Sequence, residues 1–208
     1  MKKQLVFLAA VLVFSWSGTA WATLWGNPVP TYKDGNMAVG LGIANYRNSL
    51  VFDYGLSSTG NIRGHYGMLE ITGVSGAEFG VGYKHDLKKT FKAGQKDARL
   101  GAFGYFTSGE YGNEWISWSY TYLDLGVGFD LKPKKNLTLF GAGILSMFKA
   151  EFKDKNNSFW DSTYSSTDLG GMGGGELLVN NELSAGIQLK FGFAGEPDTF
   201  IIYGLYRL

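Results

Sequence analysis

The chain has 208 residues and a formal net charge of +1, from 19 Lys and Arg against 18 Asp and Glu. This balance provides no strongly basic surface, so we expect no nucleic-acid partner. Cysteine is absent, which excludes disulfide scaffolds and thiolate metal sites.

The first 22 residues carry the features of a secretory signal peptide. Two lysines open the segment, an apolar run covers residues 5–14, and an A-x-A cleavage site ends at Ala22. A membrane-spanning helix needs about 20 apolar residues, so this run is too short to be one. We therefore predict a signal peptide over residues 1–22 and one mature domain over residues 23–208.

The mature chain contains no apolar stretch long enough for a spanning helix, so insertion into a membrane would have to use strands. The signature of such strands is about ten residues in which apolar and polar positions alternate. Residues 123–131 are the clearest case, with Leu, Leu, Val, Phe and Leu on one face and Asp, Gly, Gly and Asp on the other. The pattern predicts an all-β, antiparallel transmembrane β-barrel. Its ten expected strands are 36–46, 49–57, 62–72, 76–86, 98–107, 117–131, 136–150, 170–179, 183–193 and 199–208.

Turn residues separate these strands. Short turns are expected at residues 57–61, 133–136 and 180–181, which are rich in Asn, Ser, Gly and Pro. The lysine-rich residues 87–97 are predicted to form a longer, solvated turn at the periplasmic end. Residues 107–117 and 151–169 are predicted to be outer loops. Several of their aromatic residues could contact a partner or lie at the membrane interface: Trp115, Trp118, Phe159 and Trp160.

An eight-strand barrel is the alternative. The alternation keeps its phase from Glu70 to Glu78, so residues 62–86 could form one long strand. The phase breaks between Ala44 and Leu50, which fits either a turn at residues 46–48 or a bulge in a continuous strand.

The inward-facing positions combine glycine with charge. Glycine contributes 31 of 208 residues, about twice its average share of roughly 7%, and we assign it a packing role inside a narrow barrel. Charges inside a barrel can line a water-filled path or pair and plug it. An interior of eight to ten strands is barely wider than its side chains, which favours plugging. The candidate lumen charges are Glu70, Glu78, Lys84, Arg99, Asp124, Asp130, Lys190 and Arg207.

The chain also resembles a known family. The signal peptide, the Tyr54-Gly55-Leu56 strand end, the strand-turn-strand unit over 123–143 and the terminal strand over 203–208 are similar to those of small Gram-negative outer-membrane β-barrel proteins of the porin-like type. The resemblance implies a location in the cell outer membrane, with its lipids and the barrel-assembly machinery as partners. Members of that family usually end in Phe, and Leu208 departs from this.

Few residues suggest catalysis or metal binding. Neither His65 nor His85 belongs to the H-x-S motif that outer-membrane lipid A deacylases carry. Residues 154–165 have the alternating oxygen ligands of a calcium loop, but Phe159 replaces the required glycine. We therefore predict no catalytic residue, no cofactor and no metal.

The sequence thus predicts a barrel with a structural or surface-interaction role and a surface partner of unknown kind. A narrow passive channel for small solutes is the alternative, and a lipid-modifying enzyme is a distant one. Conductance would separate the first two.

Overall fold

The computed structural model describes residues 26–208 except 33, 45–46, 72–73, 156–160 and 193–198. It contains ten strands and no helix long and apolar enough to cross a membrane among these residues. The strands are β1 (Met37–Ala44), β2 (Arg47–Gly55), β3 (Gly60–Ile71), β4 (Val74–Ala93), β5 (Lys96–Gly112), β6 (Ile116–Lys134), β7 (Leu137–Asp154), β8 (Ser162–Leu178), β9 (Leu183–Phe191) and β10 (Thr199–Arg207).

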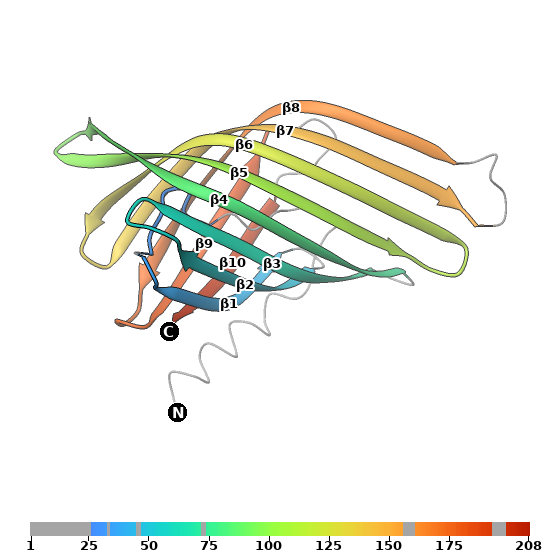
Figure 1. The fold of residues 1–208 in the computed structure, drawn as a ribbon, viewed down its shortest axis with the longest axis horizontal. Helices are drawn as coiled ribbons and strands as arrows, with labels where there is room; N and C mark the ends of the chain where they lie inside the picture. The colour runs from blue at the N-terminus through green and yellow to red at the C-terminus, as the bar shows by residue number, and fades with distance from the viewer. Residues whose placement is uncertain (1–25, 33, 45–46, 72–73, 156–160, 193–198) are drawn as a thin grey trace.

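The strands close into an antiparallel barrel in which each strand pairs with its sequence neighbours (Figure 1). The last strand closes on the first, from Ala38 opposite Arg207 to Ala44 opposite Ile201. The predicted ten-strand all-β barrel is confirmed. The eight-strand alternative is wrong, because β3 and β4 form a hairpin at residues 71–74 and β1 pairs with β2 up to Ala44 and Arg47.

The predicted facing of the side chains is also confirmed. On β6, Val127 is 56% exposed whereas Asp124 is fully buried, and on β9 Ile187 is 50% exposed whereas Gln188 is fully buried. The exposed side chains form an apolar belt around the barrel. Such a belt suits lipid, because apolar side chains face outward from strands that close into a ring.

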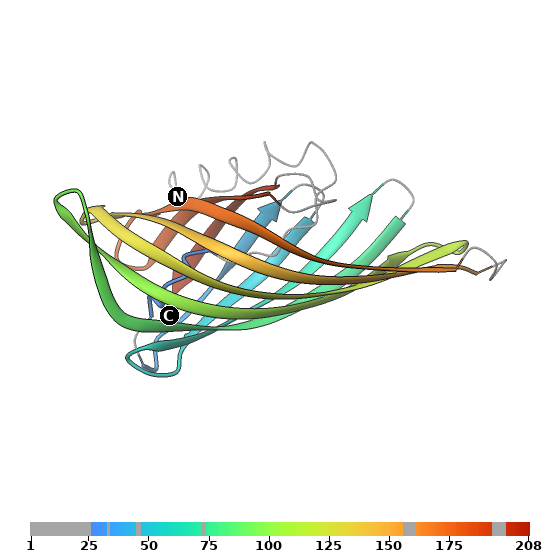
Figure 2. The ribbon, with the colours of Figure 1, turned by 90° about the horizontal axis from the view of Figure 1, so that it is seen from above.

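Three segments that were predicted as turns or loops are largely strands. Residues 87–97 do not form a long turn: β4 continues to Ala93 and β5 starts at Lys96, with a bulge between Asp86 and Thr90. The expected outer loops 107–117 and 151–169 are largely strands as well. The strands can continue outside the membrane because backbone hydrogen bonds need no apolar face. The predicted strand ends depended on apolar residues alone and so stopped where the apolar face stops. The strands β4 to β8 therefore extend as a long curved sheet past their shorter neighbours (Figure 2).

The short turns lie where the sequence predicts them. The turn after β2 is closed by a hydrogen bond from Leu56 N to Gly60 O, and the turn before β9 by one from Val179 N to Leu183 O, both of 2.9 Å. The turn between β6 and β7 covers residues 135–136. These turns and Leu208 share one end of the barrel, here called the turn end. The β5–β6 and β7–β8 hairpins project from the opposite end.

Candidate functional site: the filled lumen

The segment before β1 runs inside the barrel. Residues 26–30 and Tyr32 are buried within the ring of strands, although they belong to no strand themselves. The segment leaves the lumen at the turn end, where Gly35 N donates to Gly55 O at 2.9 Å. We call residues 26–32 the N-terminal plug.

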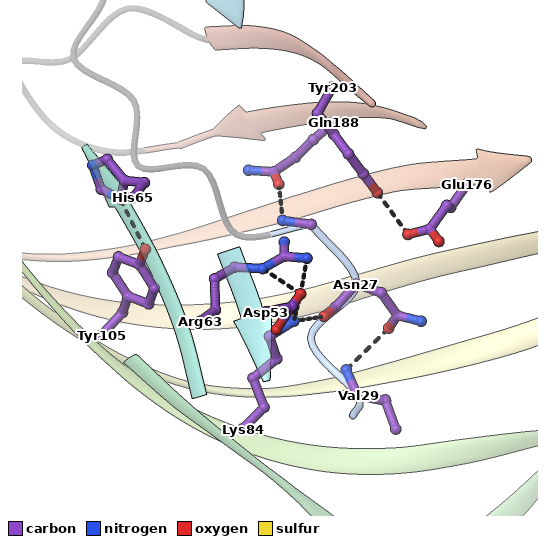
Figure 3. A network of polar contacts seen from close by, with 11 residues as sticks. Asn27, Val29, Asp53, Arg63, His65, Lys84, Tyr105, Glu176, Gln188 and Tyr203 are labelled. Atoms are coloured by element: carbon purple, nitrogen blue, oxygen red, sulfur yellow. Dashed lines mark hydrogen bonds and ion pairs between the residues drawn. The ribbon is translucent and has the colours of Figure 1, made fainter. Parts of the chain in front are cut away.

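Hydrogen bonds tie the plug to three separate strands of the wall, and Figure 3 shows two of them, to Gln188 and to Lys84. Gly26 N donates to the side-chain oxygen of Gln188 on β9 at 2.7 Å. The Asn27 amide donates to Asp130 on β6 at 3.0 Å, and Lys84 on β4 donates to the Asn27 carbonyl at 3.0 Å. Bonds of this kind satisfy polar groups that burial would otherwise leave without partners.

Glycines make room for this segment. Gly26 has a φ of 57° and lies against the guanidinium of Arg63, so a side chain there would meet both backbone strain and a clash. Pro28 packs on Gly128, and Val29 packs on Gly101. The plug is therefore seated in the wall as well as hydrogen-bonded to it.

A buried ion pair lies beside the plug. Arg63 on β3 donates to Asp53 on β2 through Nε at 2.7 Å, and a second guanidinium nitrogen bonds to the same oxygen. Lys84 Nζ lies 3.5 Å from that carboxylate, and all three side chains are at most 4% exposed. A charge in such a place is stable only while its partner remains.

A second ion pair lies closer to the turn end. Arg99 donates to Asp130 at 2.9 Å through Nε, and its guanidinium is 3.8 Å from Asp86. Asp130 thus connects Arg99 to the plug amide of Asn27. Together these contacts link β4, β5 and β6 to the plug on the turn side of the lumen.

A polar cluster centred on His65 lies further from the turn end. The two ring nitrogens of His65 are 2.8 Å from the Tyr105 hydroxyl and 3.0 Å from Glu78, and Tyr120 donates to the other Glu78 oxygen at 2.6 Å. His65 is 3% exposed, so protein groups enclose its ring on the lumen side. Within the described ranges, no three metal-ligating side chains converge on a metal site. The expected absence of catalytic, cofactor and metal residues stays a prediction.

Two inward glycines make room for tyrosine rings that pack across them. Tyr120 crosses Gly109 to reach Glu78, and its ring would collide with a methyl group at that glycine. Tyr203 crosses Gly186 in the same way and donates to Glu176 at 3.2 Å. In both cases a tyrosine, a glycine and a glutamate share one row on three adjacent strands.

The structure separates the eight predicted lumen charges into groups. Lys84, Asp130 and Arg99 meet around the plug, and Glu78 joins the His65 cluster. Lys190 lies 5.5 Å from the ring of Tyr122, and Arg207 lies 5.5 Å from the ring of Tyr32. Asp124 is buried on β6, and Glu70 lies on β3 with its side chain outside the described part of the structure.

Sequence reasoning missed the central ion pair and the plug. Asp53 and Arg63 alternate with apolar neighbours on β2 and β3, so the period-two pattern could have placed them inward. The plug has no such signal, because it forms no regular element. The predicted signal peptide over residues 1–22 and the other residues before Gly26 lie outside the described residues.

The side-chain polarity reverses where β5 to β8 leave the belt. On β5 to β7 the outward residues Phe106, Leu123 and Met147 are apolar, and the next outward row is polar: Ser108, Thr121, Lys149 and Ser165. On β8 the change comes one step earlier, between Leu169 and Thr167. A further polar row follows, in which the hydrogen bond from Lys149 lowers the pKa of Glu151. The reversal marks the edge of the lipid-facing surface, and we call the part beyond it the outer extension.

The inward face of the outer extension is aromatic. Tyr111 and Trp118 stack with ring planes 4° apart, and Trp118 contacts Phe152 with ring centroids 4.8 Å apart. Phe148 links Tyr122 to Tyr164, at 4.5 Å and 5.9 Å. Rings in such contacts stabilise a sheet that has no lipid around it.

Several solved structures are partly similar to this chain. The structure of Ail, the attachment invasion locus protein of Yersinia pestis, is 16% identical over 84% of this chain and 99% of that chain, with a TM-score of 0.45. The translocator domain of the autotransporter NalP from Neisseria meningitidis is 11% identical over 82% and 86%, with a TM-score of 0.44. OmpT, an outer membrane protein of Vibrio cholerae, is 10% identical over 82% and 64%, with a TM-score of 0.23. No protein-family model and no curated protein sequence matches the chain.

The closed barrel and its apolar belt make the chain a small outer-membrane β-barrel of the Gram-negative type, in contact with membrane lipid. The predicted type and location are confirmed. Contact with the barrel-assembly machinery stays a prediction.

Proposed function

We propose that this outer-membrane β-barrel is closed to solutes and has a structural or surface-interaction role, presented by its outer extension. The observation that carries the proposal is the filled lumen. The N-terminal plug and the buried ion pairs occupy the space that a solute would need.

The contacts of the plug support a closed state. Gly26 and Asn27 bond to side chains of β4, β6 and β9, so the segment is held from several sides. Water-filled channels present charges to solvent, whereas Asp53 and Arg63 are at most 1% exposed.

The outer extension supports the surface role. Its outward rows are polar over β5 to β8, so this part of the sheet suits water rather than lipid. With the turn end in the periplasm, as expected for short turns, the extension lies outside the cell. Aromatic side chains such as Trp118 and Tyr164 then face the medium above the lumen, where a partner can reach them.

Conductance in planar bilayers tests the closed state. The mature chain, refolded in detergent and inserted into a lipid bilayer, is expected to give no steady openings. Long-lived conductance steps from the intact chain would contradict the proposal and favour the narrow passive channel. Insertion is checked in the same preparation by protease resistance of the barrel.

A further inference from the structure

The outer extension ends in a long strand edge. Strand β8 pairs with β7 along residues 162–177, but it pairs with β9 only from Gly171 onward. Among the described residues, no strand pairs with residues 162–170 on the side away from β7. Figure 1 shows β8 as the margin of the extended sheet.

The neighbouring loop is too short to cover this edge. The chain leaves β9 at Phe191, opposite Gly171, and β10 starts at Thr199, opposite Lys190. The loop 192–198 connects Phe191 to Thr199 in eight steps and has to return, so it reaches at most about 14 Å at roughly 3.4 Å per step. The nine residues 162–170 extend about 30 Å at that rise. The part from Tyr164 to Ser166 is therefore out of reach of this loop.

Within the part of the chain that the structure describes, the edge also has none of the usual protections. Natural edge strands carry Lys or Pro, a bulge, or a covering segment, because unpaired N–H and C=O groups attract other strands. Residues 162–170 contain no Lys and no Pro, and their pairing with β7 has no shift in register. Their one charge is Asp168, which accepts a hydrogen bond from Ser166 at 2.8 Å.

We propose that residues 162–170 bind an extended polypeptide segment of another protein, which adds to the sheet as a strand beside β8. This inference rests on the surface role proposed above and names its partner class. The free N–H and C=O groups of a strand edge repeat every two residues, and so do those of an extended peptide. The peptide backbone can therefore form hydrogen bonds along the whole edge.

The side chains define which segment fits. On the inward face, Tyr164 is 56% exposed and contacts Phe148, so it receives apolar or aromatic residues. On the outward face, Thr163, Ser165 and Thr167 are exposed and polar. Leu169, at the level of the belt, is 76% exposed and takes an apolar residue at one end. The fitting segment therefore alternates apolar and polar residues.

A second copy in the same membrane does not fit this edge. Two copies with the same orientation are related by rotation about the membrane normal. With strands tilted by roughly 35–45°, their β8 edges would cross at about twice that angle instead of lying antiparallel. The partner is therefore a separate polypeptide.

The experiment uses a peptide that copies β7, the strand that already pairs with the other edge of β8. The peptide covers residues 145–153, in which Phe148 and Phe152 alternate with Lys149, Glu151 and Lys153. A fluorescent form is titrated with the intact barrel in detergent micelles, and anisotropy reports binding. Amide hydrogen exchange of residues 162–170 is then measured with and without peptide.

Two N-methylated peptides provide the decisive control. One carries methyl groups on the even-numbered residues and the other on the odd-numbered residues, so the side chains are unchanged. Strand addition predicts that one of the two binds at least about tenfold more weakly, since losing one to two net hydrogen bonds has this effect. It also predicts slower exchange at residues 162–170 and weaker binding to Tyr164→Ala.

Several results would overturn the inference. Equal binding of both methylated peptides would mean docking through side chains, and no binding of the parent peptide would mean that the edge is inactive. A dimer in light scattering, with residues 162–170 protected before any peptide is added, would assign the edge to a second copy. Conductance by the intact barrel would contradict the closed state alone, so the two proposals fail separately.

Discussion

Lys84 Nζ donates a hydrogen bond to the backbone carbonyl oxygen of Asn27 at 3.0 Å, across 57 positions of the sequence. The lysine belongs to the wall and the carbonyl to the plug. The same lysine lies 3.5 Å from Asp53, so one side chain connects the plug to the central ion pair. Five predictions follow from this lumen, the belt and the closure of the barrel.

Removing the plug should open the lumen. A mature chain without residues 26–32 loses the bonds to Gln188, Asp130 and Lys84, and we expect steady conductance in planar bilayers where the intact chain gives none. The matched control shortens the β5–β6 hairpin outside the membrane and should stay closed. A deleted chain that inserts but does not conduct would mean that the wall side chains alone close the lumen.

Breaking the central ion pair should destabilise the barrel strongly. Asp53→Asn leaves the Arg63 charge buried without its counter-ion, which costs about 3–5 kcal/mol in the free energy of unfolding. Urea titration of the barrel in lipid vesicles, followed by Trp fluorescence, measures this cost. The control is Asp97→Asn, because the Lys92–Asp97 pair is more than half exposed and such pairs contribute about 0–1 kcal/mol. Similar losses for both variants would contradict the buried pair.

A methyl group at Gly186 should displace the Tyr203 ring that packs across it. Gly186→Ala would collide with the Tyr203 ring and break its bond to Glu176, at a cost of about 1.5–3 kcal/mol in the same urea titration. Gly143→Ala is the control, since no atom lies within 4 Å of a methyl group there. If the two alanine variants are equally stable, Gly186 is not a packing position.

A charged side chain in the apolar belt should destabilise the barrel. Val127→Arg places a guanidinium on the lipid face and should cost roughly 2–4 kcal/mol if the residue lies near the midplane. Thr121→Arg, on the same strand and face but beyond the belt, should change the free energy of unfolding by no more than about 0.5 kcal/mol. Refolding yield into vesicles and urea titration give both values, and equal tolerance would place the membrane boundary elsewhere.

Deleting residues 203–208 should prevent stable insertion. β1 would lose five of its seven partners on β10, and each unsatisfied backbone group in lipid costs several kcal/mol. We expect the truncated chain to be exported but not to show the heat-modifiable gel migration of a folded barrel. Shortening the tip of the β7–β8 hairpin should leave that migration intact. Normal membrane assembly of the truncation would mean that closure does not depend on these residues.

The sequence predicts the barrel better than its contents. Alternation places Val127 and Asp124 on opposite faces because the strand period is two, and the same rule applies to every spanning strand. It also predicts charged inward positions such as Lys84 and Asp130. It does not predict which of them meet, because their contacts depend on the register between strands and on the plug.

The extent of the strands was less predictable for a related reason. Residues 107–112 and 162–169 are polar on one face and are read from sequence as loops, yet they pair in the structure. Backbone hydrogen bonds hold them together, and aromatic residues on the inward face replace the missing lipid contacts. The plug is harder still, since Gly26 and Asn27 have no periodicity and acquire their partners only inside the completed barrel.

The location of the plug has a consequence for the order of folding. Its contacts are distributed over β3, β4, β5, β6, β9 and β10, so its binding site does not exist until the ring is complete. We therefore expect residues 26–32 to complete these contacts only after β10 has joined β1. A chain trapped before that step would keep its N-terminal segment open to a protease added from the periplasmic side. The time at which this segment becomes protease-resistant would therefore report the time of barrel closure.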